Sequence, residues 1–121
     1  MVRRLLRTHR VVCSAVLGVE LVSAIRRRRA EHAISAVSFA RLRKRIDADA
    51  EKWDLLTVSD DVLARARACV LRSGVRTLDA IHIASAETVY QAGLRLPFVT
   101  ADAREADGAR AAGLEVIEVG R

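Results

Sequence analysis

The densest run of apolar residues lies in the second half of the chain, from Thr77 to Ala86. On a helix, apolar side chains would cover nearly the whole circumference of this stretch, and a helix with so little polar surface is buried. The pattern therefore predicts a central buried helix that has Thr77 as its N-cap and ends near Gly93. Asp79, in the first turn, is open to two interpretations. It complements the helix dipole, or its carboxylate leans toward the core and needs a partner or a metal ion.

Strands and helices alternate along the rest of the chain. Short strands are predicted at 11–13, 55–58, 98–100 and 114–119. Besides the central helix, helices are predicted at about 14–28, 31–46, 60–73 and 102–112, with helical character also at 1–8. Ser14 is the expected cap of the first of these four, and Ser59 or Asp60 caps the third, which Gly74 ends. Strands separated by helices predict one α/β domain, residues 1–121, with a parallel sheet covered on both faces.

Composition narrows the classes of function. Hydrophobic residues make up 51% of the 121 residues, which argues against disorder. Aromatic residues make up only 3%, which argues against the stacking platforms that bind single-stranded bases. The net charge of +6 favours an anionic partner, nucleic acid first. Two basic stretches, 26–29 and 41–45, are interpreted first as solvated helix surfaces and second as RNA-phosphate contacts.

The cysteines and the N-terminal half indicate an intracellular protein. Cys13 and Cys69 belong to no C-x-x-C motif, so we expect reduced residues of the core. The apolar run from Val11 to Ile25 contains Glu20, which argues against a secretory signal. No uncharged apolar run reaches the roughly 18 residues of a membrane span. We therefore expect a cytoplasmic protein that does not bind membranes.

Three acidic residues stand next to predicted strand ends or helix starts: Glu20, Asp79 and Asp102. Ligands of open α/β sheets bind outside the carboxyl ends of the strands, where these acids could converge. Three adjacent carboxylates repel one another unless a cation binds them, and oxygen ligands select Mg²⁺ or Mn²⁺. Two alternatives stay open. Glu20 is a buried acid paired with an arginine, and Asp102 forms a capping box with Glu105.

Three segments then carry a resemblance to a known family. They are Val19-Glu20-Leu21, Thr77-Leu78-Asp79-Ala80-Ile81-His82-Ile83-Ala84-Ser85-Ala86, and Val99-Thr100-Ala101-Asp102 followed by an Ala-rich helix and Gly113-Leu114-Glu115-Val116. From about Val11 to Gly120 the chain resembles a PIN domain, and more narrowly the VapC toxins of bacterial toxin–antitoxin pairs. The resemblance implies a three-layer α/β/α fold with a parallel sheet. It also implies an Mg²⁺- or Mn²⁺-dependent endoribonuclease, often dimeric, that a small VapB-type antitoxin inhibits.

The resemblance assigns roles to individual residues. Glu20, Asp79 and Asp102 would be the catalytic carboxylates and metal ligands, and Thr100 would be the hydroxyl residue that helps to hold the site. Asp107 is either a fourth acid or a solvent-facing helix residue, and we favour the second. His82, one turn beyond Asp79, is either a proton carrier or a packed or hydrogen-bonded histidine, and we again favour the second.

The chain departs from the family at its beginning. The family opens with a strand that carries an aspartate followed by Ser or Thr, and this strand is the central one of the sheet. Here no Asp or Glu precedes Glu20, and Met1 to Arg10 resembles the tail of the next helix. We therefore expect an N-terminally truncated PIN-like domain that lacks the opening strand and helix and cleaves RNA poorly.

A missing central strand has a structural consequence. The strands near 11–14 and 97–100 should flank its place, roughly 9.6 Å apart and without ladder hydrogen bonds, unless they close the gap by pairing directly. Exposed strand edges of this kind are prone to aggregation. Two other classes of function remain open: a non-catalytic remnant that binds the antitoxin, and a basic nucleic-acid-binding domain without catalysis.

Overall fold

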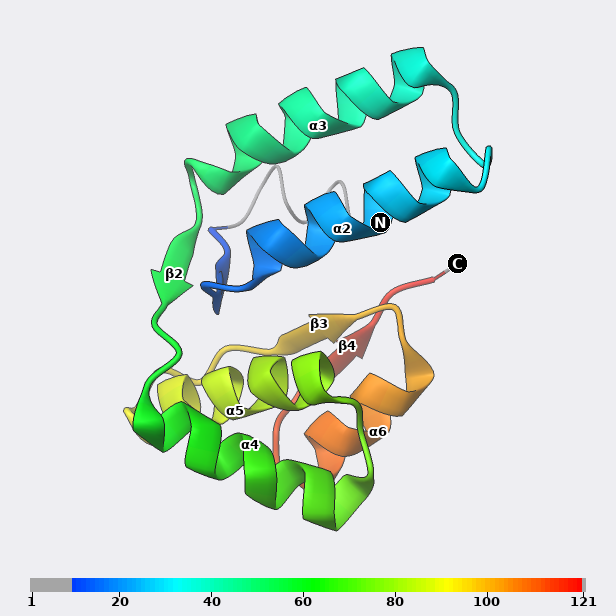
Figure 1. The fold of residues 1–121 in the computed structure, drawn as a ribbon. Helices are drawn as coiled ribbons and strands as arrows, with labels where there is room; N and C mark the ends of the chain where they lie inside the picture. The colour runs from blue at the N-terminus through cyan, green and yellow to red at the C-terminus, as the bar shows by residue number, and fades with distance from the viewer. Residues whose placement is uncertain (1–9, 121) are drawn as a thin grey trace.

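The computed structural model describes residues 10–120, which have a mixed α/β fold (Figure 1). The elements in chain order are β1 (Val12–Ser14), α2 (Leu17–Ala30), α3 (Ala36–Ala50), β2 (Asp54–Leu56), α4 (Asp60–Ser73), α5 (Thr77–Gln91), β3 (Phe98–Thr100), α6 (Ala103–Ala111) and β4 (Val116–Glu118). The helical character predicted for 1–8 lies outside the described residues.

Helix α5 is the centre of the core, as the apolar pattern predicts. Its residues Ala80, Ile83 and Ala84 are completely buried. Helix α4 packs along α5 and contributes Val62 and Cys69 to the same cluster, and α6 and β1 also contact α5. The predicted cap is wrong by one residue. Arg76 occupies the N-cap position with an extended backbone and no side-chain cap bond, and Thr77 is the first helical residue.

Two other helix ends are as predicted. Ser59 caps α4, because its Oγ accepts a hydrogen bond of 3.2 Å from the backbone N–H of Val62. Gly74 ends α4 in the left-handed region, with φ of 66°, where a residue with a Cβ would be strained. Local side-chain chemistry therefore fixes where α4 begins and ends.

The starts of the first two helices differ from the prediction. Ser14 is the last residue of β1, and α2 begins only at Leu17. The Ser14 hydroxyl instead accepts a hydrogen bond of 3.4 Å from the Val16 N–H in the connecting turn. Helix α3 begins at Ala36 rather than at 31, because Ser35 caps it through the Ser38 N–H at 3.1 Å. Before it, His32 has a φ of 58°, which breaks the helical path.

The strands within residues 10–120 pair in parallel, as predicted, but no ladder joins them into a single sheet. The described residues form two separate parallel pairs: β1 with β2, and β3 with β4. Val12 pairs with Asp54 in the first, and Phe98 pairs with Val116 in the second. No ladder joins β1 to β3 within residues 10–120, so the alternative in which these strands pair directly is contradicted. The expected lack of ladder hydrogen bonds between them is confirmed.

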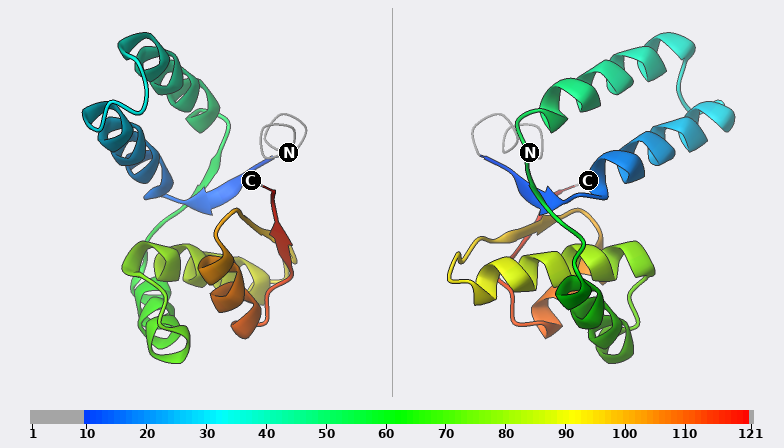
Figure 2. Two further views of the ribbon diagram at one scale, coloured as in Figure 1. Left: turned by 90° about the vertical axis from the view of Figure 1, so that its right-hand side faces the viewer. Right: turned by 60° about the vertical axis from the view of Figure 1, so that its left-hand side comes forward.

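Helices α2 and α3 form a hairpin that projects away from the rest of the fold (Figure 2). They pack against each other, and α3 has no fully buried residue. None of the helices within residues 10–120 has the length and apolar character to cross a membrane.

Both cysteines are free, in agreement with the prediction of reduced thiols. Cys69 is completely buried in the core, whereas Cys13 in β1 is partly exposed. Burial raises the pKa of the Cys13 thiol to about 11, and the negative charge of Asp54 adds to the shift. Cys13 is therefore an inert thiol near neutral pH rather than a nucleophile.

The free strand edges lead to a prediction about self-association. Val99 in β3 is 44% exposed, and a lysine there places a charge beside an edge that no strand pairs with among the described residues. Charged residues on edge strands discourage pairing between molecules. We expect Val99→Lys to reduce concentration-dependent association several-fold in sedimentation or light scattering. Val37→Lys, at a 64% exposed position in α3, is the matched control and should change it much less. Equal effects of both would refute edge pairing.

Candidate functional site

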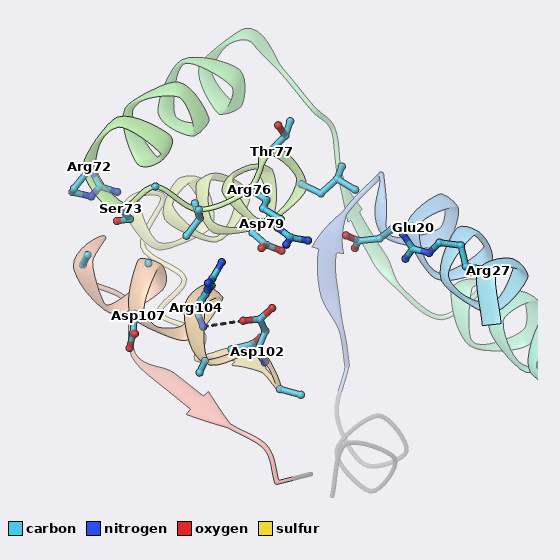
Figure 3. A pocket seen from close by; sticks show the side chains of 18 residues that line it. Glu20, Arg27, Arg72, Ser73, Arg76, Thr77, Asp79, Asp102, Arg104 and Asp107 are labelled. Carbon is cyan, nitrogen blue, oxygen red and sulfur yellow. Dashed lines mark hydrogen bonds between the residues drawn. The ribbon is translucent and has the colours of Figure 1, made fainter. Parts of the chain in front are cut away.

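A single cavity brings together the three predicted acids. It has a volume of about 1550 Å³, and Glu20, Asp79 and Asp102 all line it (Figure 3). Glu20 lies in the first turn of α2 after β1, Asp79 in the first turn of α5, and Asp102 directly after β3. The acids therefore come from three elements that are distant in the sequence. Their predicted separation of roughly 4–8 Å stays a prediction.

Asp102 both caps a helix and keeps an oxygen free for a ligand. Its Oδ1 accepts hydrogen bonds from the backbone N–H groups of Arg104, at 2.8 Å, and Glu105, at 3.3 Å. Its Oδ2 has no protein partner within residues 10–120. The buried Thr100, only 7% exposed, accepts a hydrogen bond of 3.0 Å from the Asp102 N–H through its Oγ1. Thr100 therefore fixes the turn that positions the Asp102 carboxylate.

Glu20 has a different partner from the arginine that we considered. Its Oε1 lies 2.7 Å from Nε2 of His82, and both side chains are partly buried. This contact joins the first turn of α2 to α5 and holds the Glu20 carboxylate on the cavity side. His82 is thus a hydrogen-bonded histidine, as we favoured, and it positions Glu20.

A double-mutant cycle measures this contact. We expect Glu20→Gln and His82→Gln, singly and together, to give a coupling of about 0.5–1.5 kcal/mol in the free energy of unfolding, the usual range for one hydrogen bond. Chemical denaturation of the four proteins provides the measurement. Additive effects, within about 0.3 kcal/mol, would mean that the contact contributes nothing to stability.

Glu105 adjoins the site, although it does not line the cavity, and the sequence does not predict its closeness to the acids. Burial raises its pKa to about 7. The Thr100 hydroxyl opposes this shift by a hydrogen bond, whereas a hydrogen bond with Asp79 and the charges of Asp79 and Asp102 add to it. The Glu105 carboxyl therefore lies near the charges of Asp79 and Asp102. A capping box requires it to reach back to the Asp102 N–H, which Thr100 occupies. No signal in the sequence distinguishes a Glu105 that lies near Asp79 from a Glu105 that completes a capping box.

Asp107 lies at the border of the cavity and faces solvent. Its side chain is 81% exposed and pairs with Arg110, one turn along α6, at 3.6 Å. This placement agrees with the solvent-facing interpretation. Nothing in its surroundings holds it toward the other acids.

The donor chemistry of the cavity fits a hard divalent cation. Glu20, Asp79 and Asp102 line the cavity and supply only carboxylate oxygens. The charges of Asp79 and Asp102 also raise the pKa of the neighbouring Glu105, and a proton or a cation relieves such repulsion. As the side chains lie, no three His, Cys, Asp or Glu residues in the described part of the chain are close enough to bind one ion directly. Mg²⁺ keeps several water ligands, so acids around one cavity can hold it through water.

Comparisons with known proteins do not add to these observations. No family model matches the chain, and neither the curated proteins nor the solved structures include a significant match to it.

Proposed function

We propose that this chain is an Mg²⁺- or Mn²⁺-dependent endoribonuclease of the VapC type, with a three-layer PIN-like fold that lacks the family's central strand. Its substrate would be RNA, and a VapB-type antitoxin would inhibit it in the cytoplasm. The toxin would also self-associate. The observation that carries the proposal is the cavity shared by Glu20, Asp79 and Asp102. The acids come from three elements, and oxygen-only sets of this kind suit Mg²⁺ or Mn²⁺.

The arrangement of the strands also supports the proposal. The β1–β2 and β3–β4 pairs are parallel, and no ladder joins them among the described residues, which is expected if the family's central strand is missing between them. Glu20 and Asp102 both follow the carboxyl ends of strands, which is where ligands of α/β sheets bind.

The roles of the residues follow from their surroundings. Asp79 and Asp102, with Glu20, would hold the divalent ion, which when bound supplies acidity for an attacking water and neutralises charge that develops on the phosphate. Thr100 keeps the Asp102 turn rigid, and His82 keeps Glu20 on the cavity side. Asp102 is our candidate for the general base, because its Oδ2 is free of protein partners among the described residues.

Metal binding and RNA cleavage test the proposal together. We expect calorimetry to detect Mn²⁺ binding by the 121-residue protein, and we expect slow cleavage of single-stranded RNA that EDTA abolishes. Cleavage should be slow because no acidic residue precedes Glu20 to match the family's first aspartate.

The two alternative functions give different results in the same assays. Mn²⁺ binding without cleavage, even at high protein concentration, together with co-purification of an antitoxin, would identify a non-catalytic remnant. RNA binding without any Mn²⁺ binding would identify a basic nucleic-acid-binding domain and refute the metal site. Fast cleavage that Asp79→Asn abolishes would show that the missing aspartate is not needed.

A further inference from the structure

Arginines line the same cavity as the acids. Arg27 belongs to α2, Arg76 immediately precedes α5, and Arg104 belongs to the first turn of α6. Figure 3 shows Arg76 and Arg104 extending toward Asp79, with Arg27 on the Glu20 side. The cavity therefore combines carboxylates with guanidinium groups that come from three separate elements.

These three guanidinium groups have no acidic partner in the described part of the chain. No ion pair or side-chain hydrogen bond joins Arg27, Arg76 or Arg104 to another residue within 10–120. Arg72, a fourth arginine of the cavity, differs because it lies 3.9 Å from Glu87. All three unpaired arginines are exposed. They are therefore available to an anionic ligand without breaking an internal contact.

A polynucleotide backbone is the anion that suits this arrangement. Guanidinium groups bind phosphate oxygens in a bidentate manner, and they are more weakly hydrated than lysine. Because the arginines surround acids that would hold a cation, a phosphodiester could contact the cation while neighbouring phosphates contact the arginines. A flexible single strand can follow a cavity lined by arginines from three parts of the chain, whereas a stiff duplex cannot bend into it at low cost.

We propose that Arg27, Arg76 and Arg104 bind the backbone phosphates of single-stranded RNA around the scissile bond. This inference rests on the proposed function, since it names the residues that hold the substrate of that site. It assigns the main phosphate contacts to the cavity rather than to the basic face of α3, where Arg45 already pairs with Asp49 at 3.2 Å.

The salt dependence of RNA binding tests the inference without any cleavage. Fluorescence anisotropy would follow a labelled ten-nucleotide oligouridylate in EDTA, from about 50 to 300 mM KCl. Each phosphate contact on a single strand contributes about 0.7 to the slope of log affinity against log salt concentration. The variant Arg27→Gln/Arg76→Gln/Arg104→Gln should therefore lower the magnitude of the slope by about 2.

A variant of α3 provides the matched control. Arg41→Gln/Arg43→Gln/Lys44→Gln removes the same number of charges from exposed positions outside the cavity, and it should leave the slope unchanged. An equal loss in both variants, an unchanged slope in the cavity variant, or no RNA binding by the wild type would overturn the inference. Competition by an acidic peptide as effective as unlabelled RNA would overturn the assignment to a polynucleotide.

The same proteins separate this inference from the proposed function. Mn²⁺ binding by the cavity variant should persist, because the arginines hold phosphate and not the cation. If the wild type binds no Mn²⁺ but the slopes behave as expected, the nuclease proposal fails while the phosphate contacts stand. If Mn²⁺ binds and the slopes do not differ, the contacts fail while the metal site stands. Denaturation curves of both variants confirm that the comparison is made between folded proteins.

Discussion

Replacing Asp79 with asparagine is expected to weaken Mn²⁺ binding more than 100-fold and to remove any divalent-dependent RNA cleavage. The reason is that Asp79 lines the same cavity as Glu20 and Asp102, and its charge contributes to the raised pKa of Glu105. Loss of a residue that only orients a ligand costs about 10–100-fold, so loss of a principal ligand should cost more. Calorimetric titration with Mn²⁺ and a timed RNA digestion measure the two effects.

The same variant separates the two interpretations of Asp79. If this acid only complements the dipole of α5, asparagine lowers the free energy of unfolding by about 0.3–1 kcal/mol and does not alter metal binding. If it belongs to a group of repelling carboxylates, asparagine leaves stability unchanged or raises it in the absence of metal, because it removes a negative charge next to Glu105.

Asp60→Asn is the control for this comparison. Asp60 is an exposed acid in the first turn of α4 and does not line the cavity. The Asp60→Asn variant should lower the free energy of unfolding by the small amount expected for the helix dipole, and it should leave the affinity for Mn²⁺ unchanged. Equal Mn²⁺ affinity of the Asp79→Asn and Asp60→Asn variants would contradict a metal site at Asp79.

The features that the sequence predicts well are the ones that depend on local chemistry. The nearly continuous apolar surface of α5 predicts its central position, and Ser59 and Gly74 mark the two ends of α4. Glu20, Asp79 and Asp102 line one cavity, as a general rule of α/β topology suggests for acids next to strand ends, and their role as a site stays a prediction.

The features that the sequence does not reveal depend on contacts between distant segments. Glu105 matches a capping box on sequence spacing, and only the packing of α6 against α5 brings it near the charge of Asp79. His82 and Glu20 are 62 positions apart, so nothing local identifies them as partners. The separation into two strand pairs differs from these cases. The family resemblance predicts the lack of a ladder between β1 and β3, whereas the pattern of short apolar runs alone does not determine which strand edges meet.

Substitution of Ile83 by alanine is expected to have the largest effect on stability, a loss of about 3 kcal/mol in the free energy of unfolding. Ile83 is completely buried in α5 among Val62, Cys69 and Ala109. Truncation of a buried isoleucine costs about 2–5 kcal/mol, because it removes apolar contacts and leaves a cavity. The site of Gly108 in α6 shows how tight this region is, since a Cβ there would lie only 3.1 Å from Cδ1 of Ile83 and 2.7 Å from Cγ1 of Val75.

The effect should reach the candidate site, because Asp79 lies one turn before Ile83 on the same helix. The free energy of unfolding is expected to fall by about 1.5 kcal/mol for each molar increase in urea. A loss of about 3 kcal/mol in this free energy therefore lowers the urea concentration at the unfolding midpoint by about 2 M. Ile46→Ala is the matched control. Ile46 lies in α3, which has no buried residue, and its truncation should cost less than about 1 kcal/mol. Similar midpoints for the two variants would mean that α5 is not the centre of the core.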